Sequence, residues 1–347
     1  MLNHKIIEAF AQTRHQGLSF PFLKENGELL SISAKSGLAF SPASLDLYRD
    51  LYNNALNLCE IYPQFFRFFL GITLDLETLG MQGNMGDNLV KYVLDRDLYS
   101  QETSDTRRLE IINMLAMKGK EPNYHSDPKD ALVNRVRTFF SNPNQFVKFN
   151  KPLFYELTHI VFFLTDFGKR DFEDCEALIK TLTNVGLIAF LDDDTDLLSE
   201  VCLCFSYLKT PAPEIWKSKC ANSIATIKIR FVDADNSQAL PPVDEYHAYI
   251  VINWLIQSIG GNAFAQEFKN GVPIFEKTDQ QDSPLAVLSH KLHDTKLSFN
   301  GASNSEIFVA NTFMNEGQIN HTRTAISSVP TGPAFFNKLT HGSILLA

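Results

Sequence analysis

The sequence predicts an all-α protein in which about 10–12 helices form an α/α toroid, with an inner ring of helices inside an outer ring. Three observations favour this fold class. Helix start and stop signals recur along the chain, strand patterns are scarce, and residues 157–164 and 248–259 are apolar on nearly all faces. Helices of this last kind are buried on both sides. A stack of helical repeats is the alternative, and it would normally show a repeat of about 34–47 residues.

The first part of the chain, residues 1–40, is predicted to be an irregular lead-in in which GELLSISAKSGLAF is compatible with a small hairpin. Ser41 and Pro42 then provide an N-cap and a proline at the first helical position. Apolar residues recur from there at spacings of three and four, with a break at Pro63. These features predict helices from residue 42 onward.

Further helical segments of about 12–20 residues follow, with Pro, Gly or Asp between them. They cover residues 103–119, 127–142, 152–168, 171–191, 194–210, 212–231 and 244–261. Residues 228–235 are ambiguous between helix and strand, and residues 295–347 are predicted to be a looser C-terminal segment. We expect a single helical domain over residues 1–347.

The composition is typical of a globular protein, with 44% hydrophobic residues, 20% charged residues and 28 phenylalanines. The net charge of -9 argues against nucleic acid as a partner. Five cysteines indicate a reducing compartment, the segment MLNHKIIEAF lacks the features of a signal peptide, and no apolar run approaches the roughly 20 residues of a membrane span. We therefore predict a cytoplasmic protein with a small-molecule substrate and no membrane span. A protein or peptide partner fits the composition as well.

Polar residues interrupt several of the apolar helical segments. In YELTHIVFFLTDFG (155–168), Glu156 and His159 are three residues apart, so their side chains are neighbours on a helix. The segment DEYHAY repeats this spacing with Asp244 and His247. Glu-x-x-His is the spacing on the metal-binding helices of di-iron and di-manganese carboxylate proteins. The two pairs therefore indicate metal ligands.

A run of acidic residues lies between these two pairs. The segment DDDTDLLSE places Asp193, Asp196 and Glu200 at i, i+3 and i+7, which predicts one acidic stripe on a helix face. A solvated face at a helix start is the alternative interpretation, because Asp there complements the helix dipole. Asp166 lies on the same helix face as His159 but about 10 Å farther along the axis. It is predicted to orient a ligand or to act as a catalytic acid or base.

Imidazole and carboxylate ligands together suit zinc, iron or manganese, and carboxylates that face each other in a buried site need a cation. We therefore predict a divalent metal, zinc or iron, as the cofactor. We also expect His159 and Asp166 to share a central cavity that faces the helix carrying His247, since buried polar groups need partners. The predicted metal ligands are His159, Glu200 and His247, with Glu156 and Asp244 as further ligands or their supports, and the predicted catalytic residues are Asp166, Asp193 and Asp196.

The segment DEYHAYIVINWL resembles the Asp-x-Tyr-His-Thr segment of protein prenyltransferase β-subunits, which are α/α toroids. The match falls on Asp244, Tyr246 and His247. This resemblance implies that His247 binds a catalytic zinc ion. The same enzymes use an Asp-x-Cys pair, where this sequence has Glu200 and Cys202.

Two further resemblances involve the acidic run. DDDT (192–195) resembles the Asp-x-Asp-Asp-Thr motif of class II terpene cyclases, also α/α toroids, with Leu191 in place of the first Asp. This resemblance implies that Asp193 is a proton donor. LTHIVFFLTDFG, DTDLLSE and YHAY are similar to the pattern of a bacterial family of helical proteins, over roughly residues 150–260. That similarity implies a shared site but no particular activity.

Three functions follow from these observations. The favoured one is a metal-dependent enzyme in biosynthesis, acting on an organic substrate with apolar surface in a helical cavity. The second is a metal-free cyclase or isomerase that uses buried carboxylates and histidines as acid and base. The third is a non-catalytic helical scaffold or binding protein.

Overall fold

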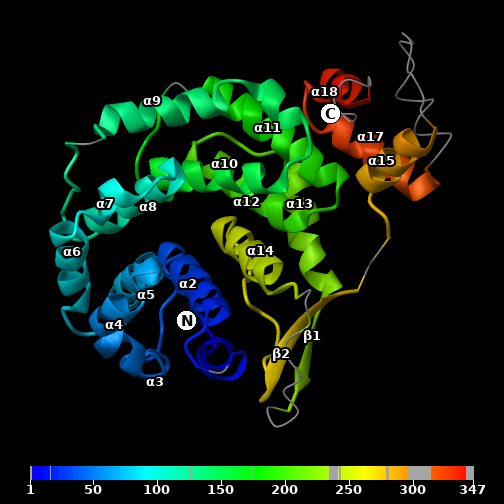
Figure 1. The fold of residues 1–347 in the computed structure, drawn as a ribbon. Coiled ribbons are helices and arrows are strands. Elements are labelled where there is room, and N and C mark those ends of the chain that lie inside the picture. The colour runs from blue at the N-terminus through cyan, green and yellow to red at the C-terminus, as the bar shows by residue number, and fades with distance from the viewer. Residues whose placement is uncertain are drawn as a thin grey trace. The chain divides into compact units, whose positions relative to one another are not determined.

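The protein is described by a computed structural model that is mostly helical (Figure 1). It describes residues 2–15, 17–125, 127–173, 175–233, 241, 244–278, 281–295 and 314–340. Within these ranges the strands form a single two-stranded sheet. The prediction of an all-α protein is confirmed, while the toroidal arrangement of the helices stays a prediction. None of the helices in these ranges combines the length and apolar character needed to cross a membrane.

The chain folds into two compact units, each made of two segments, where the sequence analysis expects one domain. The first unit comprises Met1–Val133 and Ile227–Thr278, and the second comprises Asn134–Thr226 and Asp279–Ala347. Helix α9 (Lys129–Phe140) contains the boundary between residues 133 and 134. Each unit has its own core.

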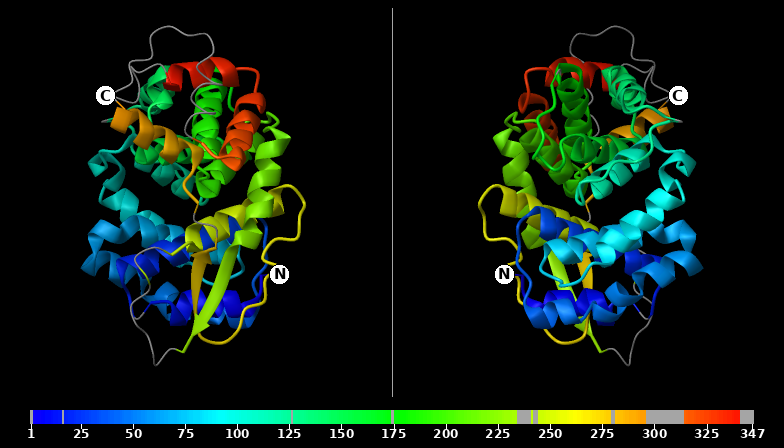
Figure 2. Two further views of the ribbon diagram at one scale, coloured as in Figure 1. Left: turned by 90° about the vertical axis from the view of Figure 1, so that its right-hand side faces the viewer. Right: turned by 90° about the vertical axis from the view of Figure 1, so that its left-hand side faces the viewer.

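The first unit contains the helices of its N-terminal segment, and its second segment adds one helix and the two-stranded sheet. Its elements are α1 (His4–Glu8), the π-helical η1 (Ala9–Thr13), α2 (Phe20–Lys35), α3 (Pro42–Asp46), α4 (Arg49–Ile61), η2 (Pro63–Phe65), α5 (Phe66–Thr78), α6 (Met85–Asp95), α7 (Leu98–Gln101), α8 (Asp105–Ala116), β1 (Ile227–Val232), α14 (Tyr246–Ser258) and β2 (Val272–Lys277). Helix α2 packs against α5 and α14, and α14 packs against β2 (Figure 2). The two strands pair antiparallel, with Ile227 opposite Lys277.

The second unit is helical throughout its described part. Its elements are η3 (Pro143–Val147), α10 (Lys151–Leu164), α11 (Glu176–Leu191), α12 (Thr195–Tyr207), α13 (Glu214–Ser223), η4 (Ile224–Thr226), α15 (Pro284–Thr295), α17 (Glu316–Ser327) and α18 (Gly332–Thr340). Helix α12 contacts α10, α11 and α13. Helix α17 packs against α11, α15 and α18 (Figure 1).

The prediction of an irregular or hairpin segment over residues 1–40 is wrong, because residues 20–35 form the long helix α2. Ser19 caps this helix by accepting a hydrogen bond from the backbone N–H of Phe22, and Pro21 lies in its first turn. Both are helix start signals. They outweigh the alternation of apolar and polar residues that suggested strands.

That alternation arises because polar residues lie on the buried face of α2 and satisfy their hydrogen bonds locally. Asn26 is fully buried and donates to the carbonyl oxygens of Phe10 and Phe22. Ser33 is also fully buried and donates to the carbonyl oxygen of Leu29 at 2.7 Å. A serine that bonds back to the preceding turn costs little inside a helix. A polar residue in this segment therefore does not mark an exposed position.

The prediction of a looser segment over residues 295–347 is wrong where α17 and α18 lie. Helix α17 begins with a capping box, in which Asn315 and Gln318 bond to each other's backbone N–H groups. Residues 296–313 and 341–347 lie outside the described part of the chain.

Trp216 is the centre of the core between α11 and α13. It is fully buried, its ring meets that of Phe205 edge-on at 6.1 Å, and its indole N–H donates to Ser328 Oγ at 2.9 Å. Gly186 on α11 lies directly under this ring, because a Cβ atom at position 186 would be 2.3 Å from Cζ3 of Trp216. The close approach of the indole ring to α11 therefore requires a residue without a side chain at position 186.

We therefore expect Gly186→Ala to lower the free energy of unfolding by about 1–3 kcal/mol, because overpacking in a dense core forces its neighbours to shift. Gly71→Ala in α5 is the matched control. A Cβ atom there would meet Met114 Sδ at an ordinary 3.5 Å, and alanine is the better helix former by up to about 1 kcal/mol. Urea denaturation followed by circular dichroism measures both. Equal stability of the two variants would contradict this account of the core.

Candidate functional site

The candidate site lies between α10 and α12, which pack against each other in the second unit (Figure 1). Asn150 caps α10 by accepting a hydrogen bond from the backbone N–H of Leu153. Asp194 caps α12 by accepting one from the backbone N–H of Leu197 at 3.1 Å. The two caps fix where each helix begins and hence which side chains face the neighbouring helix.

Asp196 and Glu200 are one turn apart on α12 and face α10. A carboxylate oxygen of Asp196 and a carboxylate oxygen of Glu200 lie within 4.8 Å of each other. The Tyr155 hydroxyl donates to Asp196 Oδ2 at 2.8 Å, and the Thr158 hydroxyl donates to Glu200 Oε2 at 2.5 Å. Glu200 is only 2% exposed. Two acidic groups are therefore held close together, one of them away from water, by hydroxyls from the adjacent helix.

Two groups next to these carboxylates, the Tyr155 phenol and the Cys204 thiol, keep their protonated and neutral forms. Burial raises the pKa of the Tyr155 phenol, and the charges of Asp196, Asp194 and Glu200 raise it further. Burial likewise raises the pKa of the Cys204 thiol, with a further contribution from Glu200. Tyr155 therefore stays a hydrogen-bond donor to Asp196, and Cys204 is an unreactive thiol.

Asp193 lies outside this site. Its φ of 56° places it in the left-handed region, just before the N-cap Asp194, so it is not part of the helix that carries Asp196. Its carboxylate forms an ion pair with Lys219. The prediction that Asp193, Asp196 and Glu200 form one helical stripe is therefore wrong for Asp193 and confirmed for the other two.

Glu156 and His159 lie on α10, one turn apart as predicted, but both side chains are exposed. The rings of Phe162 and Phe163 lie 5.9 and 6.2 Å from the imidazole of His159. The expectation that His159 is a buried polar residue is wrong, because the buried polar residue of this segment is its neighbour Thr158. A common site for His159, Asp166 and the histidine at 247 stays a prediction.

Asp166 follows the end of α10 in a left-handed turn. Asp166, Phe167 and Gly168 have φ values of 44°, 54° and 84°. Such values cost of order 1–3 kcal/mol at non-glycine residues and need support from the surroundings. Phe167 supplies it by packing on Phe162 and on Tyr207 of α12. The turn is therefore anchored to the helix that carries the two carboxylates.

Asp244 belongs to the first unit, where it is part of a buried ion network. Arg14 contacts Asp244 Oδ1 at 3.1 Å and Glu25 Oε2 at 2.7 Å. The carboxylate of Asp244 also accepts backbone N–H groups of Tyr246 and Phe275. These contacts give Asp244 a structural role, since they join the start of α14 to β2 and to the N-terminal helices.

His247 also lies in the first unit, on the first turn of α14. Its Nε2 is 3.9 Å from Glu28 Oε1 of α2, and the Tyr246 hydroxyl donates to the other oxygen of Glu28 at 2.9 Å. Its side chain is 25% exposed. The imidazole is therefore accessible and next to a carboxylate, and its role as a ligand stays a prediction.

A family model described as "Domain of unknown function (DUF6902)" matches residues 2–341. The chain belongs to this family. The match covers all the described residues of both units, so the α10–α12 site and the Arg14 network are both parts of the DUF6902 domain. No curated protein and no solved structure matches the chain.

Sequence reasoning on this DUF6902 domain missed the residues that position the carboxylates, namely Tyr155 and Thr158. Their spacing of three places them on one face of α10, just as Asp196 and Glu200 share one face of α12. The signal was the small polar Thr158 within an otherwise apolar face. The sequence analysis assigned a functional role to the adjacent His159 instead.

Proposed function

We propose that the protein is a metal-dependent enzyme and that Asp196 and Glu200 supply carboxylate ligands for a divalent cation. The observation that carries this proposal is the pairing of a buried Glu200 with Asp196 one turn away, each carboxylate held by a hydroxyl from α10. Hydroxyl donors of this kind orient ligating carboxylates in metalloproteins.

A cation is favoured by the repulsion between the two carboxylates, since the hydroxyl groups that donate to them are neutral. Two unit charges 4.8 Å apart repel by roughly 3 kcal/mol at an effective dielectric constant of about 20. The hydroxyls of Tyr155 and Thr158 stabilise the negative charges without neutralising them. A divalent cation bound by both carboxylates would offset this repulsion.

The donor chemistry restricts which metal binds. Carboxylate oxygens alone suit magnesium, calcium or manganese, whereas zinc or iron favours a site with imidazole ligands. The sequence prediction of zinc or iron therefore depends on His159 and His247. When bound, such an ion supplies Lewis acidity, which polarises a substrate oxygen or lowers the pKa of a bound water. Tyr155 and Thr158 would hold the two carboxylates at fixed positions, and the apolar side chains of α10 and α12 favour an organic substrate.

The geometry of Asp193 weighs against a metal-free cyclase. Lys219 forms an ion pair with Asp193, and this pairing requires the ionised carboxylate. A general acid that protonates a substrate needs the neutral form.

We expect Glu200→Gln to weaken the binding of a divalent metal by about 10- to 100-fold, because it removes one ligating charge without changing the shape of the side chain. Isothermal titration with manganese, magnesium, zinc and anaerobic iron(II) measures the affinity. A metal present at 100 times its Kd should also stabilise the wild type by about 2.7 kcal/mol.

Glu176→Gln is the matched control, since Glu176 is an exposed glutamate of the same unit that pairs with Lys180. It should leave the metal affinity unchanged. His159→Ala and His247→Ala, measured in parallel, test whether an imidazole takes part. If the wild type binds none of these metals, or if Glu200→Gln binds them as tightly as the wild type, the proposal is wrong and a metal-free function takes its place.

A further inference from the structure

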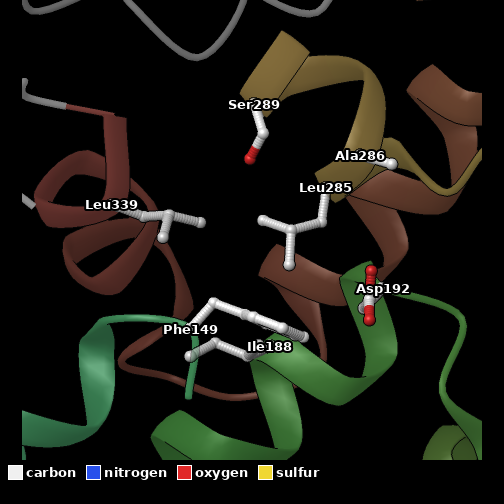
Figure 3. A pocket seen from close by; sticks show the side chains of 7 residues that line it. All are labelled: Phe149, Ile188, Asp192, Leu285, Ala286, Ser289 and Leu339. Carbon is white, nitrogen blue, oxygen red and sulfur yellow. The ribbon is translucent and has the colours of Figure 1, made fainter. Parts of the chain in front are cut away.

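A pocket in the second unit lies between the C-terminal part of α11 and the helices α15 and α18 (Figure 3). Phe149 and Ile188 form one side of it, and Leu285 and Leu339 point toward each other across it. Two polar groups complete the lining. The Ser289 hydroxyl points into the space, and the Asp192 carboxyl stands at its edge. The pocket is thus apolar with a single acidic group.

We propose that this pocket binds a small amphiphilic amine, a molecule with one ring-sized apolar body and an ammonium group on a short arm. The apolar body would lie between Leu285 and Leu339, and the ammonium group would pair with Asp192. This site is distinct from the carboxylates of Asp196 and Glu200, and the inference does not depend on the proposed metal-dependent function.

The size of the pocket sets the size of the ligand. Its volume is about 210 Å³, whereas an apolar cavity of about 150 Å³ accommodates benzene. The additional space suits a short arm on a single ring. One side of the pocket is accessible, because Phe149 is 51% exposed. A ligand can therefore enter without any rearrangement of the core.

The charge of the ligand follows from the three consecutive aspartates at the end of α11. Asp194 forms an ion pair with Lys151 at 2.7 Å, and Asp193 forms one with Lys219. Within the described part of the chain, no Lys or Arg forms an ion pair with Asp192, whose Oδ1 accepts a hydrogen bond from Ser283 at 3.0 Å. Asp192 is therefore the one of the three aspartates without an ion pair to a described lysine or arginine, and the charge of Lys151 acts on it without such a contact.

The direction in which the pKa of Asp192 is shifted agrees with the absence of an ion pair at this carboxyl group. Burial raises the pKa of Asp192, and its acidic neighbours Asp194 and Asp193 raise it further against the opposing effects of Ser283 and Lys151. A carboxyl group in such surroundings gains free energy from a bound cation, because the cation favours its ionised form. A neutral or anionic ligand provides no such gain.

The test uses the full-length protein with 2-phenylethylamine as the probe and 2-phenylethanol and phenylacetate as comparators of similar shape. We expect saturable binding of the amine, binding of the alcohol weaker by about tenfold or more, and no detectable binding of phenylacetate, because only the amine pairs with the carboxylate. Isothermal titration or ligand-observed NMR measures these affinities. If the wild type binds the amine and the alcohol with equal affinity, the proposed pairing of the ammonium group with Asp192 is wrong. If neither compound binds saturably, the pocket is not a binding site for this class of ligand.

Two variants locate the binding. Asp192→Asn should reduce the affinity for the amine to that of the alcohol and leave the affinity for the alcohol unchanged, which also shows that the variant is folded. Ser289→Phe fills the pocket from its partly exposed rim and should abolish binding of both. Asp171→Asn, at an exposed aspartate of the same unit, is the control and should bind like the wild type. Unchanged amine affinity in Asp192→Asn would overturn the proposal, whereas metal binding by Glu200 is measured separately and is unaffected by that outcome.

Discussion

Replacing Arg14 by methionine is expected to lower the free energy of unfolding of the first unit by about 3–5 kcal/mol. The Arg14 side chain has no exposed surface, and its partners Glu25 and Asp244 are only 6% and 8% exposed. Methionine has a similar length but no charge, so it leaves Asp244 buried without the guanidinium group and Glu25 with only its contact to His15. Arg14 also donates to the carbonyl oxygen of Pro273 at 2.6 Å. Urea denaturation measures the loss, and hydrogen exchange locates it in the first unit.

Arg230→Met is the matched control in the same unit. Arg230 pairs with Glu276 across the two-stranded sheet, but the two side chains are 51% and 44% exposed. Exposed ion pairs contribute at most about 1 kcal/mol, so this variant should unfold almost like the wild type. If the free energy of unfolding falls by the same amount in the two arginine variants, the buried network does not hold the unit together.

The same network predicts an acid-sensitive contribution to stability. Burial by itself would raise the pKa of Glu25, but hydrogen bonds from His15 and Arg14 outweigh it and lower the pKa below its usual 4.5. A carboxyl group with a lowered pKa in the folded state stabilises the protein above its pKa in the unfolded state, and this contribution is lost as the pH falls through the lower, folded value. Stability should therefore decline below pH 4.5, and Glu25→Gln should reduce the slope of that decline.

Trp216→Ala is expected to destabilise the second unit by about 3–5 kcal/mol, because it removes the largest fully buried side chain of the described core and leaves a cavity between α11 and α13. Ser328→Ala removes the acceptor of the indole N–H, together with the bond that the hydroxyl donates to the carbonyl oxygen of Ala325, and should cost about 1–3 kcal/mol. Thermal and urea denaturation of the two variants compare these losses. A loss for Trp216→Ala no greater than that for Ser328→Ala would show that the cavity collapses.

The two substitutions at the α11–α13 contact should also be strongly non-additive. Once Trp216 is alanine, a Cβ atom at position 186 no longer meets the indole ring. Gly186→Ala should then be neutral or stabilising by up to about 1 kcal/mol, because alanine favours a helix. A double-mutant cycle measures this coupling. Additive losses would show that Gly186 is required for some reason other than the tryptophan.

Much of the helical structure could be predicted because its signals are local. Ser41 accepts a hydrogen bond at the start of α3, with Pro42 at the first position, and Pro63 separates α4 from α5. Ser104 caps α8 in the same way. Caps and proline breaks act within a few residues of the chain, so the sequence alone reveals them. The prediction failed for α2, where buried polar side chains bond back to their own helix.

Part of the candidate site could also be predicted. The spacing of Asp196 and Glu200 places both on one face of any helix that contains them. The sequence does not reveal at which residue this helix begins, because each of the three aspartates in DDDT is a possible N-cap. Asp194 takes this position, which leaves Asp193 in a left-handed turn outside the helix. The choice depends on a difference of about 1 kcal/mol or less between similar caps, so it cannot be read from the sequence.

The sequence by itself determined where most helices lie and which of their faces are apolar, since periodicity and capping are properties of short segments. Only the tertiary structure decided which polar groups meet. Arg14 is an isolated arginine in the sequence, yet it contacts Asp244, which is 230 residues away. Thr158 is one of many threonines until α12 brings Glu200 to its hydroxyl. Such pairs form because a buried polar group must find a partner wherever the packing of the helices puts one, and no local pattern encodes that partner.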